Sequence, residues 1–177
     1  MSIESVTVES IMTKDVKTAN KDQGVNVVAS IMSENNIGSV VITEGEDNTP
    51  IGIITERDII RIFGTTKILK VLTLQLHAHD IMSKPVITIN ARSSIKDAIQ
   101  TMQLNNIRRL PIVNSEKRMM VGIVTDSDIF RAIMKSQSLL TTFSESIVIE
   151  QYKPVYERLS EFMLGEMLLP TTTNNNQ

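Results

Sequence analysis

Two heptapeptides of the chain carry the residue types needed to bind a sugar hydroxyl or an anion. Residues 52–58 read GIITERD and residues 122–128 read GIVTDSD, so each has glycine, two apolar residues, threonine and a later aspartate. A threonine hydroxyl and an aspartate carboxylate can accept hydrogen bonds from a vicinal diol, as acidic residues do with ribose in nucleotide-binding folds. The same Thr-x-x-Asp spacing is close to a helix capping box, so a purely structural role is the alternative.

Each heptapeptide is predicted to lie where a strand ends and a helix begins. Such a junction offers free backbone N–H groups and the positive end of a helix dipole to an anion. One copy alone would favour the capping role, but recurrence at the same point of a repeat favours a binding site. The candidate ligand-binding residues of the two motifs are therefore Thr55, Asp58, Thr125 and Asp128.

A pair of adjacent arginines, Arg108 and Arg109, precedes the apolar stretch Leu110–Val113. Arginines can hold phosphate groups through charge-assisted hydrogen bonds, and the alternative is a solvated basic pair. The equivalent residues of the first copy are Gly38 and Ser39. Two phosphate sites built from these positions would therefore not be equivalent.

Both motifs belong to an internal repeat with a shift of 70 residues, which brings residue 52 onto residue 122. Ile11-Met12-Thr13 returns as Ile81-Met82-Ser83, and Asn35-Asn36-Ile37 returns as Asn105-Asn106-Ile107. The apolar spacing and turn residues predict the order β-α-β-β-α in both copies. In the first copy, strands are predicted over 17–18, 39–43 and 51–55, and helices over 24–35 and from 56. In the second copy, strands are predicted over 87–89, 109–113 and 120–125, and helices over 94–105 and from 126. Ser94 and Asp97 are predicted to form a capping box.

This order predicts an α/β fold in which two small repeats, each marginal alone, pack against each other. The expected boundaries are repeat 1 over 8–63, a linker over 64–79 and repeat 2 over 80–135. A helical C-terminal extension over 136–169 and a disordered tail over 170–177 would follow. The extension has an amphipathic stretch from Pro154 to Leu169. That helix is expected to cover an apolar face of its own assembly, and the alternative is a recognition helix for another protein.

Composition and charge exclude several functional classes. The net charge is −2 and aromatic residues make up 3%, which argues against nucleic-acid binding as the main role. The absence of cysteine excludes a disulfide scaffold and cysteine-ligated metal, and is consistent with a reducing cytoplasm. No apolar run is long enough for a membrane span, and the N-terminus lacks the basic region of a signal peptide. A cytoplasmic protein is therefore expected.

Catalysis has little support in the sequence. The two histidines, His77 and His79, stand beside Asp80 and would share a face on a strand, which hints at a metal ion. A single short motif of this kind is weak, so no metal site is predicted. The candidate residues include no evident pair of nucleophile and base. A non-catalytic protein without a required cofactor is expected.

Taken together, the duplicated motifs resemble the cystathionine β-synthase (CBS) domain in its tandem arrangement, the Bateman module. The matching residues are the Ile-Met-Thr/Ser openings, the stretch Ile107–Val113 and both Gly-h-h-Thr-x-x-Asp motifs, over about residues 8–135. The resemblance implies two repeats packed sheet to sheet about a pseudo-twofold axis. It also implies homodimers and clefts that bind AMP, ADP or ATP, and in some members S-adenosylmethionine or NAD.

The resemblance also implies which residues share a cleft, because the ribose motif of one repeat faces the adenine and phosphate elements of the other. One cleft would combine Thr55, Asp58, Ile87, Thr88, Arg108 and Arg109. The other would combine Thr125, Asp128, Lys17, Thr18, Gly38 and Ser39. The cleft with the arginines is the better candidate for a polyphosphate, and the other would bind a less charged ligand, bind weakly or stay empty.

Three functions were weighed. The favoured one is a regulatory module that senses adenine nucleotides and signals to an unknown protein partner in trans. The alternative is a dimerising adaptor with vestigial clefts and a partner-binding C-terminal helix. Nucleic-acid binding controlled by nucleotide comes third, because the repeats are nearly neutral and residues 136–177 carry a net charge of −3.

Overall fold

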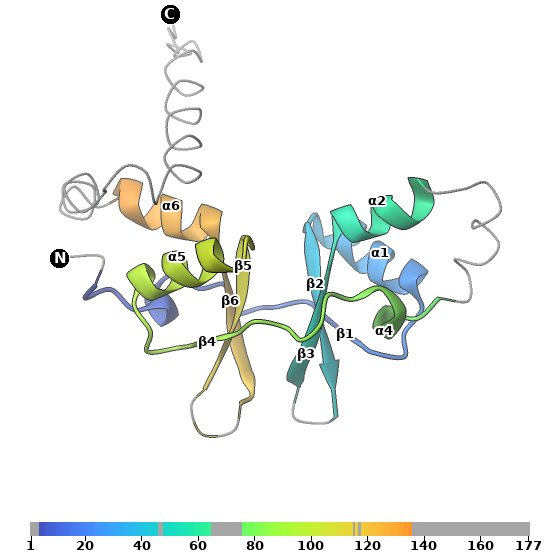
Figure 1. The fold of residues 1–177 in the computed structure, drawn as a ribbon, viewed down its shortest axis with the longest axis horizontal. Coiled ribbons are helices and arrows are strands. Elements are labelled where there is room, and N and C mark those ends of the chain that lie inside the picture. The colour runs from blue at the N-terminus through green and yellow to red at the C-terminus, as the bar shows by residue number, and fades with distance from the viewer. Residues whose placement is uncertain (1–3, 46–47, 65–75, 115, 117, 136–177) are drawn as a thin grey trace, which may run out of the picture.

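The computed structural model describes residues 4–45, 48–64, 76–114, 116 and 118–135. These residues form two halves that lie side by side, each with a three-stranded sheet and its own helices (Figure 1). The predicted C-terminal extension and disordered tail, and most of the predicted linker, lie outside the described residues. Within the described part, no helix combines the length and the apolar character that crossing a bilayer requires.

The first half contains β1 (Thr18–Asn20), α1 (Val25–Asn35), β2 (Ser39–Glu44), β3 (Thr49–Thr55) and α2 (Glu56–Gly64). Its sheet has the order β1-β2-β3, with β1 parallel to β2 and β2 antiparallel to β3. The second half contains β4 (Ile89–Asn90), α5 (Ile95–Leu104), β5 (Arg109–Val113), β6 (Met120–Thr125) and α6 (Asp126–Lys135). Its sheet has the same order and the same directions.

The predicted α/β fold of two β-α-β-β-α repeats is confirmed. The strands over 109–113 and 120–125 have the predicted bounds, whereas β4 is shorter and later than predicted. The capping box at the start of α5 is present, with the Asp97 amide donating to Ser94 Oγ at 3.1 Å. It satisfies N–H groups that the first turn of a helix cannot bond internally.

The repeat extends to unusual backbone angles. Asn36 and Asn106 have φ values of 50° and 51°, and Asn48 and Arg118 have values of 49° and 53°. Each pair is related by the 70-residue shift. Asparagine enters this left-handed region at low cost because its short polar side chain bonds locally. Both copies therefore end their first helix in the same way and turn alike between their last two strands.

Each half has its own apolar core. The first is built on Val28, Val40, Ile42 and Ile54, all fully buried. The second is built on Ile95, Leu110, Ile112 and Val124, also fully buried. Because inward residues alternate with outward ones along the strands, one face of each sheet meets the helices.

The segment that opens each repeat packs on the opposite half. The N-terminal segment includes the short 3₁₀ helix η1 (Val8–Ser10), and Val8 is fully buried in the second core. The segment before β4 includes α4 (Ala78–Ile81), and Ala78 is fully buried in the first core. Figure 1 shows the same exchange, with η1 beside α5 and α4 beside the first half.

Two methionines fix this exchange by occupying the space above two glycines. A Cβ at Gly52 would overlap the Met82 side chain, at 2.8 Å from Cγ. A Cβ at Gly122 would overlap Met12 in the same way, at 2.9 Å from Cγ. Backbone pairs beside them, Ile53 with Ser83 and Thr13 with Ile123, hold the crossing segments in register. The glycine of each heptapeptide is therefore needed for packing.

We expect Gly52→Ala to lower the free energy of unfolding by about 1–3 kcal/mol, because the added methyl group overpacks the hollow that Met82 fills. Urea denaturation measures this loss. In a Met82→Ala background the same change should cost less, since Met82 Cγ and Sδ are gone and only the Cβ of residue 82, at 3.0 Å, remains close. Gly122→Ala is the matched variant, and Met12→Ala should rescue it in part as well, because the Thr13 carbonyl oxygen at 3.0 Å remains close there. Equal cost in the presence and absence of Met82 would contradict this explanation.

Candidate functional site

The threonine and aspartate of each heptapeptide are bonded to each other. The Thr55 amide and hydroxyl both donate to Asp58 Oδ2, at 2.9 and 2.7 Å. The Thr125 amide and hydroxyl donate to Asp128 Oδ2 at 3.0 and 2.7 Å. All four residues are half-buried at the start of α2 or α6. The two copies therefore present the same group in the same geometry.

This geometry is that of a capping box. Ser94 makes the same two bonds to Asp97 Oδ2 at the start of α5, at 2.9 and 2.8 Å. The capping role weighed from the sequence is thus realised at both heptapeptides. A ligand role would be additional to it, and the box would fix the carboxylate in place before a ligand arrives.

The expectation of free backbone N–H groups at these helix ends is wrong for α6. The Asp126 amide donates to the Arg108 carbonyl at 3.0 Å, and the Asp128 amide donates to Thr125 Oγ1 at 3.2 Å. The Ser127 amide donates to Asp126 Oδ1 at 2.8 Å. Acidic side chains also occupy the first turn, where they already complement the helix dipole. At α6 an anion would therefore have to bind to side chains, and Arg108 and Arg109 are the candidate cations there.

The strand starts with Gly38–Ser39 and Arg108–Arg109 lie next to the heptapeptides of their own halves. Ser39 is paired with Thr55 across β2 and β3, and Arg109 is paired with Thr125 across β5 and β6. The Glu56 amide donates to the Gly38 carbonyl at 3.2 Å, as the Asp126 amide does to Arg108. Four of the candidate positions in each half thus gather at one sheet end.

Arg109 also reaches the other half, where its Nη1 donates to the Gly38 carbonyl oxygen. The two groups of site residues expected from the family resemblance are therefore in contact through Arg109 and Gly38. Arg109 is half-buried and Arg108 is exposed. The two arginines consequently differ: one contacts the facing half and the other is open to solvent.

The remaining candidate residues lie on the segments before and within the first strand of each half. Lys17 forms an ion pair with Asp15 at 2.9 Å, and Thr18 faces Val41 in the β1–β2 pair. Ile87 packs on the core of the second half. Thr88 lines a cleft of about 590 Å³ between the halves.

That cleft has both polar and apolar lining residues. Its lining residues are Thr49, Pro50, Ile51, Pro85, Val86, Thr88, Asn90, Val113, Asn114 and Arg118. Sequence reasoning missed Arg118 and Asn90. For Arg118 a signal was available, because it stands in the last turn of the second copy where the first has Asn48.

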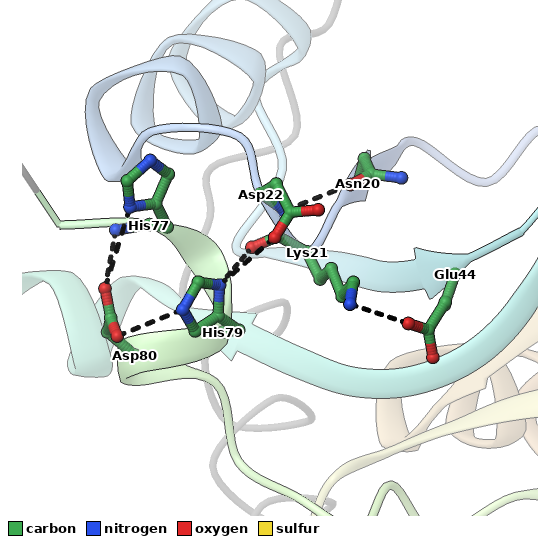
Figure 2. Close-up of polar contacts among 7 residues, drawn as sticks. All are labelled: Asn20, Lys21, Asp22, Glu44, His77, His79 and Asp80. Atoms are coloured by element: carbon green, nitrogen blue, oxygen red, sulfur yellow. Dashed lines mark hydrogen bonds and ion pairs between the residues drawn. The ribbon is translucent and has the colours of Figure 1, made fainter.

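His77 is the N-cap of α4 and His79 lies within it, where His79 contacts the first half (Figure 2). Their rings are stacked, with centroids 5.6 Å apart and an angle of 10° between the planes. His79 Nδ1 lies 3.0 Å from the Lys21 carbonyl oxygen, and its Nε2 lies 3.3 Å from Asp80 Oδ1. The strand considered for this motif is wrong, because residues 78–81 are helical. Among the residues that the structure describes, no three His, Cys, Asp or Glu side chains are grouped so as to hold a metal ion.

A lysine beside this cluster is tied to the end of β2. Lys21 Nζ lies 2.8 Å from Glu44 Oε1, as Figure 2 shows. The hydrogen bond to Glu44, and then its negative charge, raise the pKa of Lys21. The side chain of Lys21 is thus paired with Glu44, while its backbone carbonyl oxygen lies 3.0 Å from His79 Nδ1.

Comparison with known proteins supports one family. The family model of the CBS domain matches residues 8–64 and 78–135. The CBS domain-containing protein YhcV of Bacillus subtilis is 32% identical over 131 residues, covering 74% of this chain and 88% of that protein. An uncharacterised Methanopyrus kandleri protein, MK0525, is 38% identical over 134 residues, covering 73% of this chain but only 63% of its own length.

Solved structures give the same result for the fold. The CBS domain pair of protein MJ0100, solved in complex with 5′-methylthioadenosine and S-adenosyl-L-methionine, matches with a TM-score of 0.64 and 28% identity. The match covers 73% of this chain and 97% of that one. With the family model matching both repeats and well over half of the 177 residues, this chain belongs to the CBS domain family and carries two such domains in tandem.

Proposed function

We propose that this chain is a non-catalytic regulatory module that binds an adenosine ligand between its two CBS domains and signals to a protein partner in trans. The observation that carries the proposal is the duplicated, pre-bonded Thr-Asp pair at the sheet end beside Arg108 and Arg109. A relative of the same architecture, the MJ0100 pair, was solved with two adenosine compounds. A ligand acts as a signal only if it binds one conformation more tightly than another.

The proposed contacts follow the chemistry of each residue. Asp58 and Asp128 accept hydrogen bonds from the ribose hydroxyls through carboxylates that their threonines hold in place. Arg108 and Arg109 bind phosphate. Residues on the crossing segments, including Thr18 and Thr88, complete two clefts whose charge differs because Ser39 stands where the second copy has Arg109. ATP, ADP and AMP are the proposed ligands of the cleft with the arginines.

Asp58→Ala should abolish or strongly weaken nucleotide binding while lowering stability by only about 1 kcal/mol, the usual cost of losing a helix cap. Isothermal titration calorimetry with AMP, ADP, ATP, NAD and S-adenosylmethionine measures the binding. Urea denaturation measures the stability.

Asp97→Ala is the matched control, since Asp97 forms the same capping box on α5 with bonds of 2.9 and 2.8 Å. It should lose similar stability and keep its affinity for nucleotide. If both variants lose stability alike and neither loses affinity, Asp58 serves as a cap alone and the proposed ribose contact is wrong.

Replacing both Arg108 and Arg109 by alanine should weaken ATP binding about tenfold or more, because hydrogen bonds to charged groups are the strongest of their kind. Adenosine has no phosphate, so its affinity should change little. Calorimetry with the two ligands on the same variant measures the difference. Equal losses for ATP and adenosine would show that the arginines do not act on phosphate.

We also propose that the chain forms a homodimer through the apolar groove between α1 and α2. The groove is lined by Ala29, Met32, Ser33, Asn36, Ile37, Glu56, Ile59 and Ile60, and Ile60 is 68% exposed. Large exposed apolar patches rimmed by polar residues mark interaction sites, and this groove has Ile37, Ile59 and Ile60 beside Ser33, Asn36 and Glu56.

Ile60→Glu should shift the protein to a monomer, because a buried unpaired charge disfavours the interface. Light scattering after size exclusion measures the mass. Asn26→Glu, on the exposed face of α1 outside the groove, is the control and should keep the mass of the parent protein. A dimeric Ile60→Glu variant would place the interface elsewhere.

A further inference from the structure

Arg109 is the one candidate phosphate-binding residue that contacts the facing half in the described structure. It begins β5, and its Nη1 donates to the carbonyl oxygen of Gly38, which directly precedes β2. The bond joins residues 71 positions apart and links the two CBS domains at the ends that carry the Thr-Asp pairs. The guanidinium is half-buried there.

Gly38 fits this contact because it has no side chain. A Cβ at this position would lie 3.1 Å from Arg109 Nη2, so that the guanidinium would have to shift slightly, and 3.5 Å from Nη1, which is an ordinary contact. The same Cβ would lie 3.4 Å from Glu56 Oε2. The acceptor that the first half offers to the arginine is thus the Gly38 carbonyl oxygen.

The contact has no counterpart by symmetry. The 70-residue shift places Ser39 at the position of Arg109 and Arg108 at the position of Gly38. A serine side chain ends at Oγ and is several bonds shorter than an arginine. The first half therefore has no side chain at this position long enough to reach across to the second.

A neutral carbonyl is a weaker acceptor for a guanidinium than a phosphate oxygen. Charge-assisted bonds between two ionised groups are shorter and roughly twice as strong as bonds between neutral groups. Arginine also offers five N–H donors in a planar fork, so a phosphate can bind two of them at once. A phosphate arriving beside Arg109 would compete with Gly38 for the same donors.

We propose that Arg109 is a latch between the two CBS domains: it binds the Gly38 carbonyl when the cleft is empty and exchanges that partner for a ligand phosphate. This rests on the proposed nucleotide function and adds the step by which binding changes the protein. The phosphate releases the link between the halves, and adenosine, which lacks a phosphate, leaves it closed. The charge of the ligand therefore controls how firmly the two halves are joined.

The chain contains no cysteine, so two spin labels can be placed without removing native thiols. Glu34→Cys and Leu104→Cys are equivalent positions on α1 and α5, both exposed, with Leu104 at 86%. Double electron–electron resonance on the labelled full chain then reports the distance between the halves. ATP and adenosine are the probes, and calorimetry on the same samples shows which of them binds.

A latch predicts that ATP shifts or broadens the distance distribution and that adenosine does not. Arg109→Met should broaden the distribution without ligand and remove the response to ATP. Gly38→Ala, which displaces the guanidinium but keeps its charge, should raise ATP affinity about threefold or more, because the competing bond is weakened.

The latch is wrong if ATP binds and the distances do not move, or if Arg109→Met leaves the ligand-free distribution unchanged. It is also wrong if Gly38→Ala leaves ATP affinity the same or lowers it. These results would leave nucleotide binding intact. Absence of binding heat for ATP and adenosine alike would instead overturn the proposed function, and the latch with it. Since Arg109→Met removes a half-buried side chain, Arg109→Lys serves as a second variant that keeps the charge but loses the fork.

Discussion

The exchange of opening segments is the constraint on which the rest of the structure depends. Each half is a three-stranded sheet with two helices, and each completes its core with a segment that belongs in sequence to the other repeat. A methionine at the end of that segment fills the space over a glycine. Because cores are closely packed, this fit sets the distance and orientation of the crossing chain. The crossing segments thereby tie each sheet to the other repeat, through the backbone pairs of Ile53 with Ser83 and of Thr13 with Ile123.

The binding chemistry follows from that placement. Each glycine that receives a methionine is three residues before the threonine of the capping box, so one short motif serves both packing and helix capping. The capping box then fixes an aspartate carboxylate at the end of the sheet. The two halves differ at two adjacent positions, where the first has Gly38 and Ser39 and the second has Arg108 and Arg109. A module with near-twofold symmetry in its backbone is thus asymmetric in its charge.

Much of the fold could be predicted because the repeat contains each helix and strand twice, so that two segments of sequence support each assignment. Strands 109–113 and 120–125 and the capping box of Ser94 were predicted correctly, since their apolar pattern and polar boundaries are strong. The exchange was not predicted, because Met12 and Met82 show no sign in sequence of which glycine they will meet. Nor could spacing reveal that the first N–H groups of α6 already have acceptors. The stacking of His77, the N-cap of α4, on His79 could not be foreseen either.

Less of the candidate site than of the fold could be predicted from the sequence. The sequence singled out Thr55, Asp58, Thr125 and Asp128 through their recurrence, and the structure shows that each pair is bonded. Whether those residues hold a ligand, and the division of the chain at 63 and 80, stay predictions. The contact from Arg109 to Gly38 lay beyond sequence reasoning, because it depends on the distance between two sheets. Asn90 was missed for the same reason, whereas the place of Arg118 opposite Asn48 in the repeat was a signal that could have been used.

The reciprocal packing of Met12 and Met82 limits how the gene for such a protein can be divided in evolution. A gene fragment encoding one repeat would carry a methionine without its glycine and a glycine without its methionine. The smallest unit that can be fused to another gene, or moved between genes, with its core intact is therefore the pair. Recombination between the two repeats would leave a single repeat. Its opening segment and its sheet would then belong to the same copy, so no segment would cross to another half.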